Sequence, residues 1–339
     1  MPDSTLTALI AIFALAVVFD YINGFHDTAN AIATSVATRA IKPEYAILLS
    51  AVANFAGALI FGVAVAKTIG SGIVQDNLIL GNGATVLAAA LLGAIAWNLI
   101  TWRLAIPSSS SHALVGGLIG AAAAASGLNA VQWTNFFGKI VIPLVSSPLL
   151  GLIIGFALMI VILNIFVRAN PRRMNDRFRK LQIVSATYMA LSHGSNDAQK
   201  TMGIMTLALW NAYPASYADK TPPIWVILIA ATAMSMGTAA GGWRIMKTMG
   251  QRVVKLDPVH GFAAETTAAT IILGASHFGM PVSTTHVISS AIMGVGTSDR
   301  IKAVRWGVAR SIVTAWVLTI PCSAVIAAGT YAVLNFVHL

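Results

Sequence analysis

Two short polar strings each occur twice in this chain, in the same order and inside otherwise apolar sequence. The first spans residues 24–30 and returns at 194–200, and the second spans 107–112 and returns at 281–286. The offsets between the copies are 170 and 174 residues. Because polar and charged groups are costly inside a membrane, a chain that keeps them twice is expected to use them.

The first string carries one carboxylate in each copy, Asp27 and Asp197, three residues after a glycine. A carboxylate in a low-dielectric site binds a cation or takes up a proton, which is what coupling to an ion gradient requires. We therefore predict that the two aspartates hold a coupling cation, either H⁺ or Na⁺. Side-chain carbonyl groups that could join it are those of Asn23, Asn30 and Asn196.

The glycines of this string suggest a further source of cation ligands. We expect Gly24 and Gly194 to allow the helix to unwind there, so that backbone carbonyl groups face the cation. The alternative is a purely structural role for the aspartates, as helix caps or in a buried ion pair such as Asp197 with Lys200. A duplicated pair of carboxylates favours the cation site over this alternative.

The second string has the form Pro-x-Ser-Ser/Thr-Ser/Thr-His and predicts an anion site. Proline begins or ends a helix, and the free N–H groups and dipole of a helix N-terminus favour anions. Three successive hydroxyls add donors without adding charge, which suits a small tetrahedral oxyanion such as phosphate. The alternative is that each hydroxyl bonds back to its own helix. The predicted phosphate-binding residues are Ser109, Ser110, Ser111, Ser283, Thr284 and Thr285.

Four further residues are candidates for auxiliary roles. His112 and His286 end the two copies of the second string, where they could orient it or carry protons. Lys200 and Glu265 are charged residues within apolar segments. We expect no metal beyond a coupling Na⁺ and no cofactor.

Other uses of Ser, His and Asp were weighed against transport. An intramembrane hydrolase needs one activated serine, one base and an oxyanion hole, and nothing in that chemistry requires the whole set twice. A passive channel does not need fixed carboxylates beside an anion site. Duplicated polar interruptions are instead typical of a secondary transporter with its site between two repeats, so we predict a symporter and no enzyme activity.

The composition fits an all-α polytopic membrane protein. Of the 339 residues, 57% are apolar and only 9% are charged. A membrane-spanning helix needs about 20 apolar residues. Several apolar stretches are broken by Gly, Pro or the polar strings, so we expect half-helices or re-entrant hairpins among them. The ten expected segments are 6–25, 43–66, 84–102, 107–125, 136–167, 181–210, 224–243, 261–279, 281–297 and 311–335.

The net charge of +10 is explained by topology rather than by a nucleic-acid partner. Basic residues cluster at 168–180, 244–255 and 300–310. If these clusters are cytoplasmic, Arg39 and Lys42 also lie inside, and 16 of the 21 basic residues obey the positive-inside rule. The chain is then expected in the bacterial inner membrane with both termini outside and its basic loops against lipid headgroups.

An odd number of crossings in each half makes the halves run in opposite directions. We therefore predict two inverted repeats, 1–168 and 181–339, joined by a basic cytoplasmic linker at 169–180. Small-residue pairs, in which two glycines are separated by three residues, predict close helix packing at 116/120, 151/155 and 237/241. Most such pairs pack within a chain, and a homodimer face is the alternative.

At these strings the chain resembles the inorganic phosphate transporter family, often called PiT, over nearly its whole length. The segment from His193 to Gly203, HGSNDAQKTMG, is similar to the family's second-half signature. Asp27-Thr-Ala-Asn-Ala31 with Thr34-Ser35 matches most of the first-half signature. Pro281-Val-Ser-Thr-Thr-His286 and Gly261-Phe-Ala-Ala-Glu265 also look like family elements.

The resemblance implies phosphate uptake coupled to H⁺ or Na⁺ by an elevator-like or rocking movement. It also implies that the aspartate pair binds the cation and that the Ser/Thr strings bind phosphate. The chain departs from the family pattern at Phe25-His26, where members commonly carry a small residue and Asn, and in its serine-only first string. Some relatives carry sulfate, so another oxyanion remains the alternative substrate.

Overall fold

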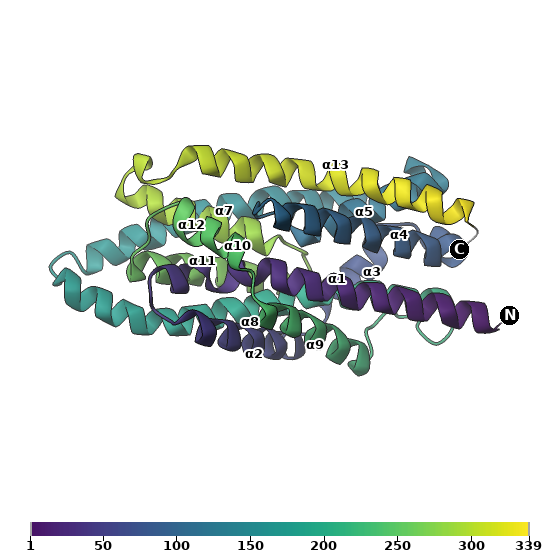
Figure 1. The fold of residues 1–339 in the computed structure, drawn as a ribbon, viewed down its shortest axis with the longest axis horizontal. Helices are drawn as coiled ribbons and strands as arrows, with labels where there is room; N and C mark the ends of the chain where they lie inside the picture. Colours follow the sequence, from purple (N-terminus) through teal and green to yellow (C-terminus); the bar gives the residue numbers. More distant parts are fainter. Residues whose placement is uncertain (1, 338–339) are drawn as a thin grey trace.

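Long helices that run side by side make up the fold, and residues 2–337 of the computed structural model are described (Figure 1). Within that range no β-strand forms, and Val74 and Val131 make one isolated antiparallel bridge. The first half contains α1 Pro2–Ala37, α2 Pro43–Ile60, α3 Ala64–Gly72, α4 Asp76–Arg103, α5 Ser110–Ser126, α6 Trp133–Phe136 and α7 Ile142–Ile165. The second contains α8 Pro171–Ala212, α9 Ile224–Ala240, α10 Trp243–Lys247, α11 Pro258–His277, α12 Thr284–Asp299 and α13 Trp306–Phe336.

The all-α membrane architecture predicted from the sequence is confirmed. Five described helical runs are long and apolar enough to cross a membrane, and the shorter α9 is also apolar. Helices α5 and α12, with 17 and 16 residues, are too short to span the bilayer, as the proline-containing strings predict. The five long runs are Thr5–Ala37, Pro43–Ile60, Asp76–Arg103, Trp133–Ile165 and Trp306–Phe336.

The largest differences from the expected segments are at the end of the first segment and at the basic linker; in addition, the expected segment 43–66 is split between α2 and α3, and 84–102 begins earlier, at Asp76. The first segment was expected to end at residue 25, but α1 continues through the polar string to Ala37. The basic segment 168–180 was expected to be a loop, but from Pro171 on it forms the first turns of α8. The local reason is that Asn170 caps this helix, with its side-chain oxygen 3.0 Å from the N of Arg172, and Pro171 follows at the first helical position.

The contacts between the two halves come in matched pairs. Helix α5 packs against α13, and its counterpart α12 packs against α7. Helix α1 packs against α9, and its counterpart α8 packs against α2, while α1 and α8 contact each other directly. This pattern is what a twofold relation between the halves produces.

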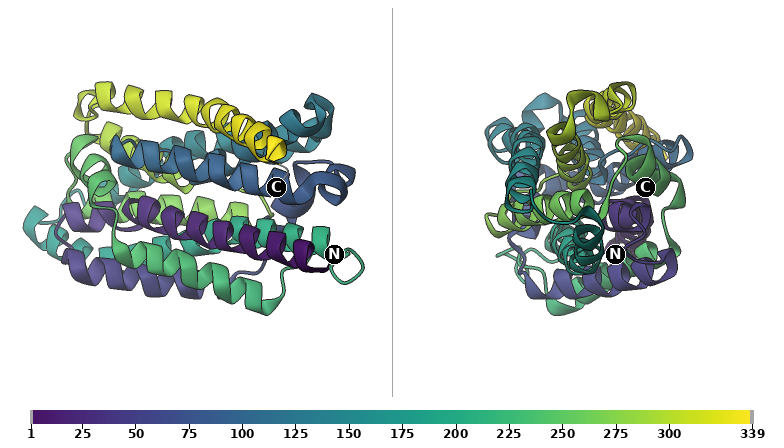
Figure 2. Two further views of the ribbon diagram at one scale, coloured as in Figure 1. Left: turned by 45° about the vertical axis from the view of Figure 1, so that its right-hand side comes forward. Right: turned by 90° about the vertical axis from the view of Figure 1, so that its left-hand side faces the viewer.

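The two halves are inverted with respect to each other. Helix α1 starts at the end of the bundle where the N-terminus lies, and its counterpart α8 starts at the opposite end (Figure 1). Both termini lie at one end of the bundle, and the α7–α8 and α12–α13 connections lie at the other (Figures 1 and 2). The arrangement agrees with an odd number of crossings in each half.

The glycines of the first string serve close packing and do not unwind the helix, contrary to our expectation. Helices α1 and α8 are continuous through Gly24 and Gly194. A Cβ atom on Gly24 would lie 2.1 Å from the carbonyl oxygen of Met234, and one on Gly194 would lie 2.1 Å from that of Asn54. Backbone carbonyls at these positions therefore stay in the helix and are not free to bind a cation.

Five of the six glycines in the small-residue pairs pack inside the chain, and the sixth, Gly241, ends α9 with a φ of 76°. Gly116 and Gly120 lie against the backbone of α13, and Gly151 and Gly155 lie against that of α12. Gly237 lies against α1, with its Cβ position 2.0 Å from the carbonyl oxygen of Tyr21. The packed glycines are used for contacts between the repeats, as expected for the commoner role of such pairs.

Candidate functional site

Both copies of the hydroxyl-rich string stand at helix N-termini, as predicted. Ser109 caps α5 and Ser283 caps α12, each accepting a hydrogen bond at 3.2 Å from the backbone N–H of the histidine three residues later. Proline and serine fix these starts locally, since the serine oxygen replaces a missing helical acceptor. Two of the six predicted phosphate ligands therefore already have a capping role, which leaves Ser110, Ser111, Thr284 and Thr285 with hydroxyls beyond the caps.

The two helix starts come together at the boundary between the repeats. The rings of His112 and His286, which are counterparts in the repeat, lie 4.5 Å apart. Ser111 donates a hydrogen bond to the carbonyl oxygen of Val282 at 3.4 Å. His286 also stacks on Trp316 at 4.0 Å between ring centroids. The strings thus form one structure on the axis that relates the halves.

Asp197 is the most heavily bonded carboxylate of this region. It is 1% exposed and accepts hydrogen bonds from Lys200 and, at 3.1 Å, from the hydroxyl of Thr284. The Nε2 atom of His193 lies 3.2 Å from its second oxygen. The ion pair between Asp197 and Lys200, which the sequence analysis gave as the structural alternative, is therefore present. It lies at the start of α12.

Asp27 lies close to Asp197, as the duplicated string predicts. One oxygen of Asp27 lies 2.6 Å from Nδ1 of His26, whose Nε2 is 3.3 Å from the hydroxyl of Thr101. Ligand atoms of Asp27, His193 and Asp197 all lie within 4.8 Å of one another, and all three residues are buried. Two carboxylates and an imidazole at this spacing could share one cation.

The three predicted asparagine ligands are all buried in the same region. The amide nitrogen of Asn30 donates to Thr285 at 2.8 Å and to Thr284 at 3.3 Å, and that of Asn196 donates to Ser276 at 2.7 Å. Among the described residues, no hydrogen-bond donor reaches the side-chain oxygens of Asn23, Asn30 and Asn196. A buried carbonyl oxygen without a donor is unusual, and oxygen is the preferred ligand of hard cations.

Glu265 is buried, but its hydrogen bonds make it a link between helices. Its carboxylate accepts from Thr34 of α1 at 2.5 Å and from Ser185 and Gln182 of α8 at 2.5 and 3.2 Å. Gln182 in turn accepts from Thr38 at 2.7 Å. Three donors satisfy this carboxylate, so among the candidates it has the clearest structural role.

Three residues of this buried polar centre were not among the residues predicted from the sequence. His26 and His193 contact the aspartates, and Asp20 is fully buried with no hydrogen-bond partner for either oxygen among the described residues. A signal for the histidines is present in the sequence. At the offset of 170 residues His193 corresponds to Asn23, and His26 corresponds to Asn196, so the two repeats exchange the same residue types.

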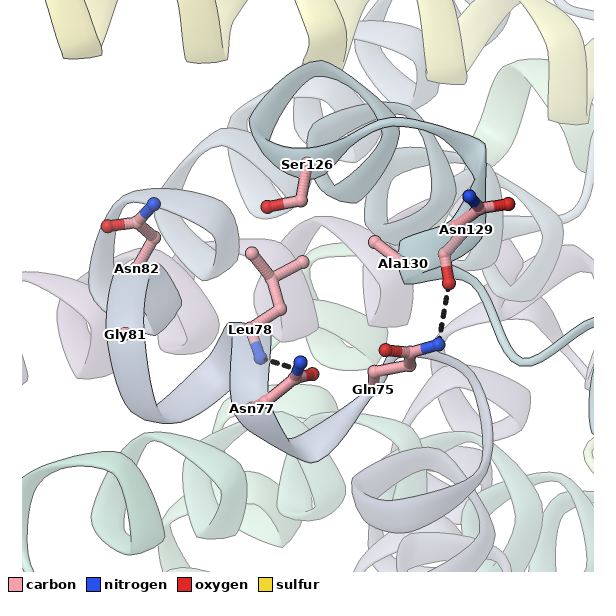
Figure 3. A pocket seen from close by; sticks show the side chains of 8 residues that line it. All are labelled: Gln75, Asn77, Leu78, Gly81, Asn82, Ser126, Asn129 and Ala130. Atoms are coloured by element: carbon pink, nitrogen blue, oxygen red, sulfur yellow. Dashed lines mark hydrogen bonds between the residues drawn. The ribbon is translucent and has the colours of Figure 1, made fainter.

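A small hollow at the end of the bundle that holds both termini differs in chemistry from this site. It has a volume of about 270 Å³ and is lined by amide, hydroxyl and apolar side chains (Figure 3). Gln75 donates across it to the carbonyl oxygen of Asn129 at 2.6 Å, and Asn77 accepts from the N–H of Leu78 at 2.9 Å. None of its lining residues is charged, so it offers no counter-ion for an oxyanion.

The fold and the buried polar centre define a class of protein, the polytopic membrane transporters built from inverted repeats. Comparison with known proteins gives the family. The model of the phosphate transporter family matches this chain twice, over residues 23–175 and 167–327, and the chain belongs to that family. The double match confirms the internal duplication.

Several similar proteins cover almost the full length of the chain. A Bacillus subtilis protein named "Probable low-affinity inorganic phosphate transporter" is 52% identical over 332 residues, covering 98% of both chains. A Rhizobium meliloti protein of the same name is 45% identical, covering 97% of this chain and 98% of its own. A solved structure named "The sodium-dependent phosphate transporter" is 27% identical, with a TM-score of 0.91 over 98% of this chain and 100% of the other.

Proposed function

We propose that this protein is a symporter that carries inorganic phosphate across the membrane together with a cation. One observation carries the proposal: the hydroxyl-lined N-termini of α5 and α12 meet beside the buried aspartates of α1 and α8. An oxyanion site and a cation site thus share one buried region. The three similar proteins named above are each called phosphate transporters, and these names support phosphate as the oxyanion.

The anion would lie at the two helix starts. Backbone N–H groups of a helix's first turn have no helical acceptor, and the helix dipole adds partial positive charge. Ser110 and Thr285 stand in the first turns of α5 and α12, and Ser110 has a hydroxyl with no hydrogen-bond partner among the described residues. Donors fixed in place before the anion arrives bind it without reordering the site.

The cation would lie between the aspartates. Asp27 and Asp197 supply charge, and the free side-chain oxygens of Asn23, Asn30 and Asn196 supply further ligands. An anion in a low-dielectric interior is costly unless a cation accompanies it. Cation and phosphate therefore favour each other's binding, which is the thermodynamic basis of coupled transport.

Transport against a gradient is the direct test. The protein would be reconstituted in liposomes, and labelled phosphate uptake would be followed under imposed pH and Na⁺ gradients in turn. We expect one gradient to drive accumulation, and Asp27→Asn and Asp197→Asn each to abolish it, because a neutral amide cannot balance a bound cation or carry its proton. Asp176→Asn, a change of the same kind at an exposed aspartate of α8, is the control.

Each outcome of this test has a definite meaning. Accumulation by either site variant at near-normal rates would contradict the coupling role of that aspartate. Labelled sulfate taken up in preference to phosphate would replace the substrate but keep the symport mechanism. Equal uptake with and without either gradient would contradict symport itself. The hydrolase alternative is dropped, because the family is one of transporters.

Localisation and assembly complete the proposal. We place the chain in the bacterial inner membrane with both termini outside, since its basic clusters then lie in the cytoplasm. The division into repeats at 169–180 and a homodimer both remain predictions. A dimer would have to use a surface other than the glycine pairs at 116/120 and 151/155, since these pack within the chain.

A further inference from the structure

Residues 30 and 200 occupy equivalent places in the two repeats. Each follows its aspartate by three residues, and each donates to a hydroxyl of the opposite repeat's string. Asn30 donates to Thr285 at 2.8 Å, and Lys200 donates to Ser111. Thr285 and Ser111 are themselves counterparts at the offset of 174 residues. The same hydrogen bond is therefore made twice, once by a neutral amide and once by an ammonium group.

The ammonium of Lys200 has the surroundings of a bound cation. It is 1% exposed and donates to the carboxylate of Asp197, to the hydroxyl of Ser111 and, at 3.3 Å, to the carbonyl oxygen of Val282. Carboxylate, hydroxyl and carbonyl oxygens are also the ligands that a hard cation takes. Asn30, by contrast, leaves its side-chain oxygen without a donor.

The buried carboxylates also differ between the two repeats, and here the extra charge belongs to repeat one. Asp20 lies in α1, seven residues before Asp27, and is fully buried without a hydrogen-bond partner among the described residues. The side chains of Thr201 and Asn23 lie next to it without forming a bond of ordinary geometry, and Asp197 and Lys200 are its charged neighbours. The counterpart of Asp20 in the second repeat is Ala190. Repeat one thus brings two carboxylates and no lysine to this region, whereas repeat two brings one carboxylate already paired with a lysine.

We propose that the Lys200 ammonium is a fixed cation that fills the repeat-two side of the cation site, beside Asp197, so that the exchangeable coupling cation binds on the repeat-one side, nearest Asp27 and Asp20. The inference rests on the proposed symport function and specifies which half of the site binds the transported cation. It follows that replacing Lys200 by the residue of the other repeat creates a new cation site. The converse change, Asn30→Lys, places an ammonium group in the existing cation site of repeat one.

The mirrored variants Lys200→Asn and Asn30→Lys test this directly. In proteoliposomes with the membrane potential clamped, the potential at which phosphate flux reverses gives the charge moved per phosphate. We expect Lys200→Asn, measured in NaCl, to carry one more cation per phosphate than the wild type. We expect Asn30→Lys to exchange phosphate without needing a cation gradient. Lys139→Asn removes the same charge at an exposed position and should match the wild type.

A binding measurement provides a readout that does not depend on transport. The thermal unfolding midpoint of detergent-purified Lys200→Asn should rise more than that of the wild type when choline chloride is replaced by NaCl at equal ionic strength, because ligand binding stabilises the folded state. Lys200→Arg keeps the charge and should keep the wild-type number of cations per phosphate, even if the rate falls. If Lys200→Asn does not fold, the arginine and Asn30→Lys variants still decide the matter.

The outcomes separate this inference from the proposed function. If neither the pH gradient nor the Na⁺ gradient drives the wild type to accumulate phosphate, the symport proposal itself is overturned. A coupled wild type together with unchanged stoichiometry and no added NaCl stabilisation in Lys200→Asn would overturn only the fixed-cation role. Loss of coupling in Lys200→Asn or Lys200→Arg would also overturn it, since Lys200 would then take part in moving charge. If phosphate transport by Asn30→Lys still depends on a cation, the fixed-cation role is overturned as well.

Discussion

Ser110 is the residue at which the anion site can be tested with least disturbance to the fold. It is the first residue of α5 and is 1% exposed, yet its hydroxyl has no hydrogen-bond partner among the described residues. Its counterpart Thr284 already donates to Asp197 at 3.1 Å. Replacement of Ser110 by alanine therefore removes a hydroxyl that is available to a ligand, without breaking a bond inside the protein.

The size of the effect follows from that difference. A hydrogen bond to a charged group contributes about 1.5–3 kcal/mol. Because about 1.4 kcal/mol is a factor of ten in affinity, Ser110→Ala should weaken phosphate binding by roughly ten-fold to a hundred-fold. Its stability should change little, since no internal hydrogen bond is lost. Sequence symmetry alone would predict equal effects at 110 and 284, whereas the structure predicts that Thr284→Ala also disturbs Asp197 and hence the cation dependence.

The assay is the concentration dependence of labelled phosphate uptake into proteoliposomes, together with the thermal unfolding midpoint of each purified variant. Ser323→Ala is the matched control. Ser323 is also buried, but its hydroxyl donates to carbonyl oxygens of its own helix, those of Thr319 at 2.7 Å and Ile320 at 3.1 Å. We expect this control to leave the apparent phosphate affinity within about two-fold of the wild type, since a hydroxyl bonded within its own helix offers no donor to a ligand.

Two results would refute this reasoning. If Ser110→Ala binds phosphate as tightly as the wild type, the strings only start helices and the substrate binds elsewhere. If Ser110→Ala lowers the unfolding midpoint together with the affinity, the hydroxyl has a structural partner. The loss of affinity then says nothing about a direct contact with phosphate. A fall in affinity at constant stability is the only combination that supports the site.

Two further predictions concern packing and topology. Gly24→Ala should lower the unfolding midpoint, because its Cβ would lie 2.1 Å from a backbone carbonyl oxygen of α9 and overpacking typically costs about 1–3 kcal/mol, whereas Gly274→Ala, with nothing within 4 Å, should not. An unchanged midpoint in Gly24→Ala would mean that the helices can separate without loss. In a Cys322→Ser background, an impermeant thiol reagent added outside intact cells should label Thr5→Cys and spare Asn175→Cys, and the reverse pattern would invert the proposed topology.

The starts of α5 and α12 could be predicted from the sequence because their causes are local. Proline removes a helical donor and serine caps the turn that follows it, so Pro107 with Ser109 and Pro281 with Ser283 begin helices wherever they stand. The glycines of the first string could not be interpreted in the same way. Gly24 permits both an unwound helix and a close helix contact, and only the position of α9 decides between them.

The site was predicted to the extent that duplication reveals it. Asp27 and Asp197 stand at equivalent positions, and the fold brings them together. His26 and His193 were not predicted, because each contacts an aspartate of its own helix but has an asparagine, not a histidine, as its counterpart in the other repeat. Asp20 is also an acidic residue in an apolar segment, but its counterpart in the second repeat is Ala190, so a comparison of duplicated residues does not identify it.

The packing of the repeats obeys the twofold relation more closely than their chemistry does. Gly24 against α9 is matched by Gly194 against α2, and Gly120 of α5 against α13 is matched by Gly294 of α12 against α7. If the two repeats exchange conformations, each lost contact is replaced by one of the same kind, so the two forms differ little in packing free energy. The residues that break the symmetry, Asp20 and Lys200, lie where we propose that the coupling cation binds. The balance between the two forms is therefore set by what occupies the site, which is the condition for a bound ion to control the direction of transport.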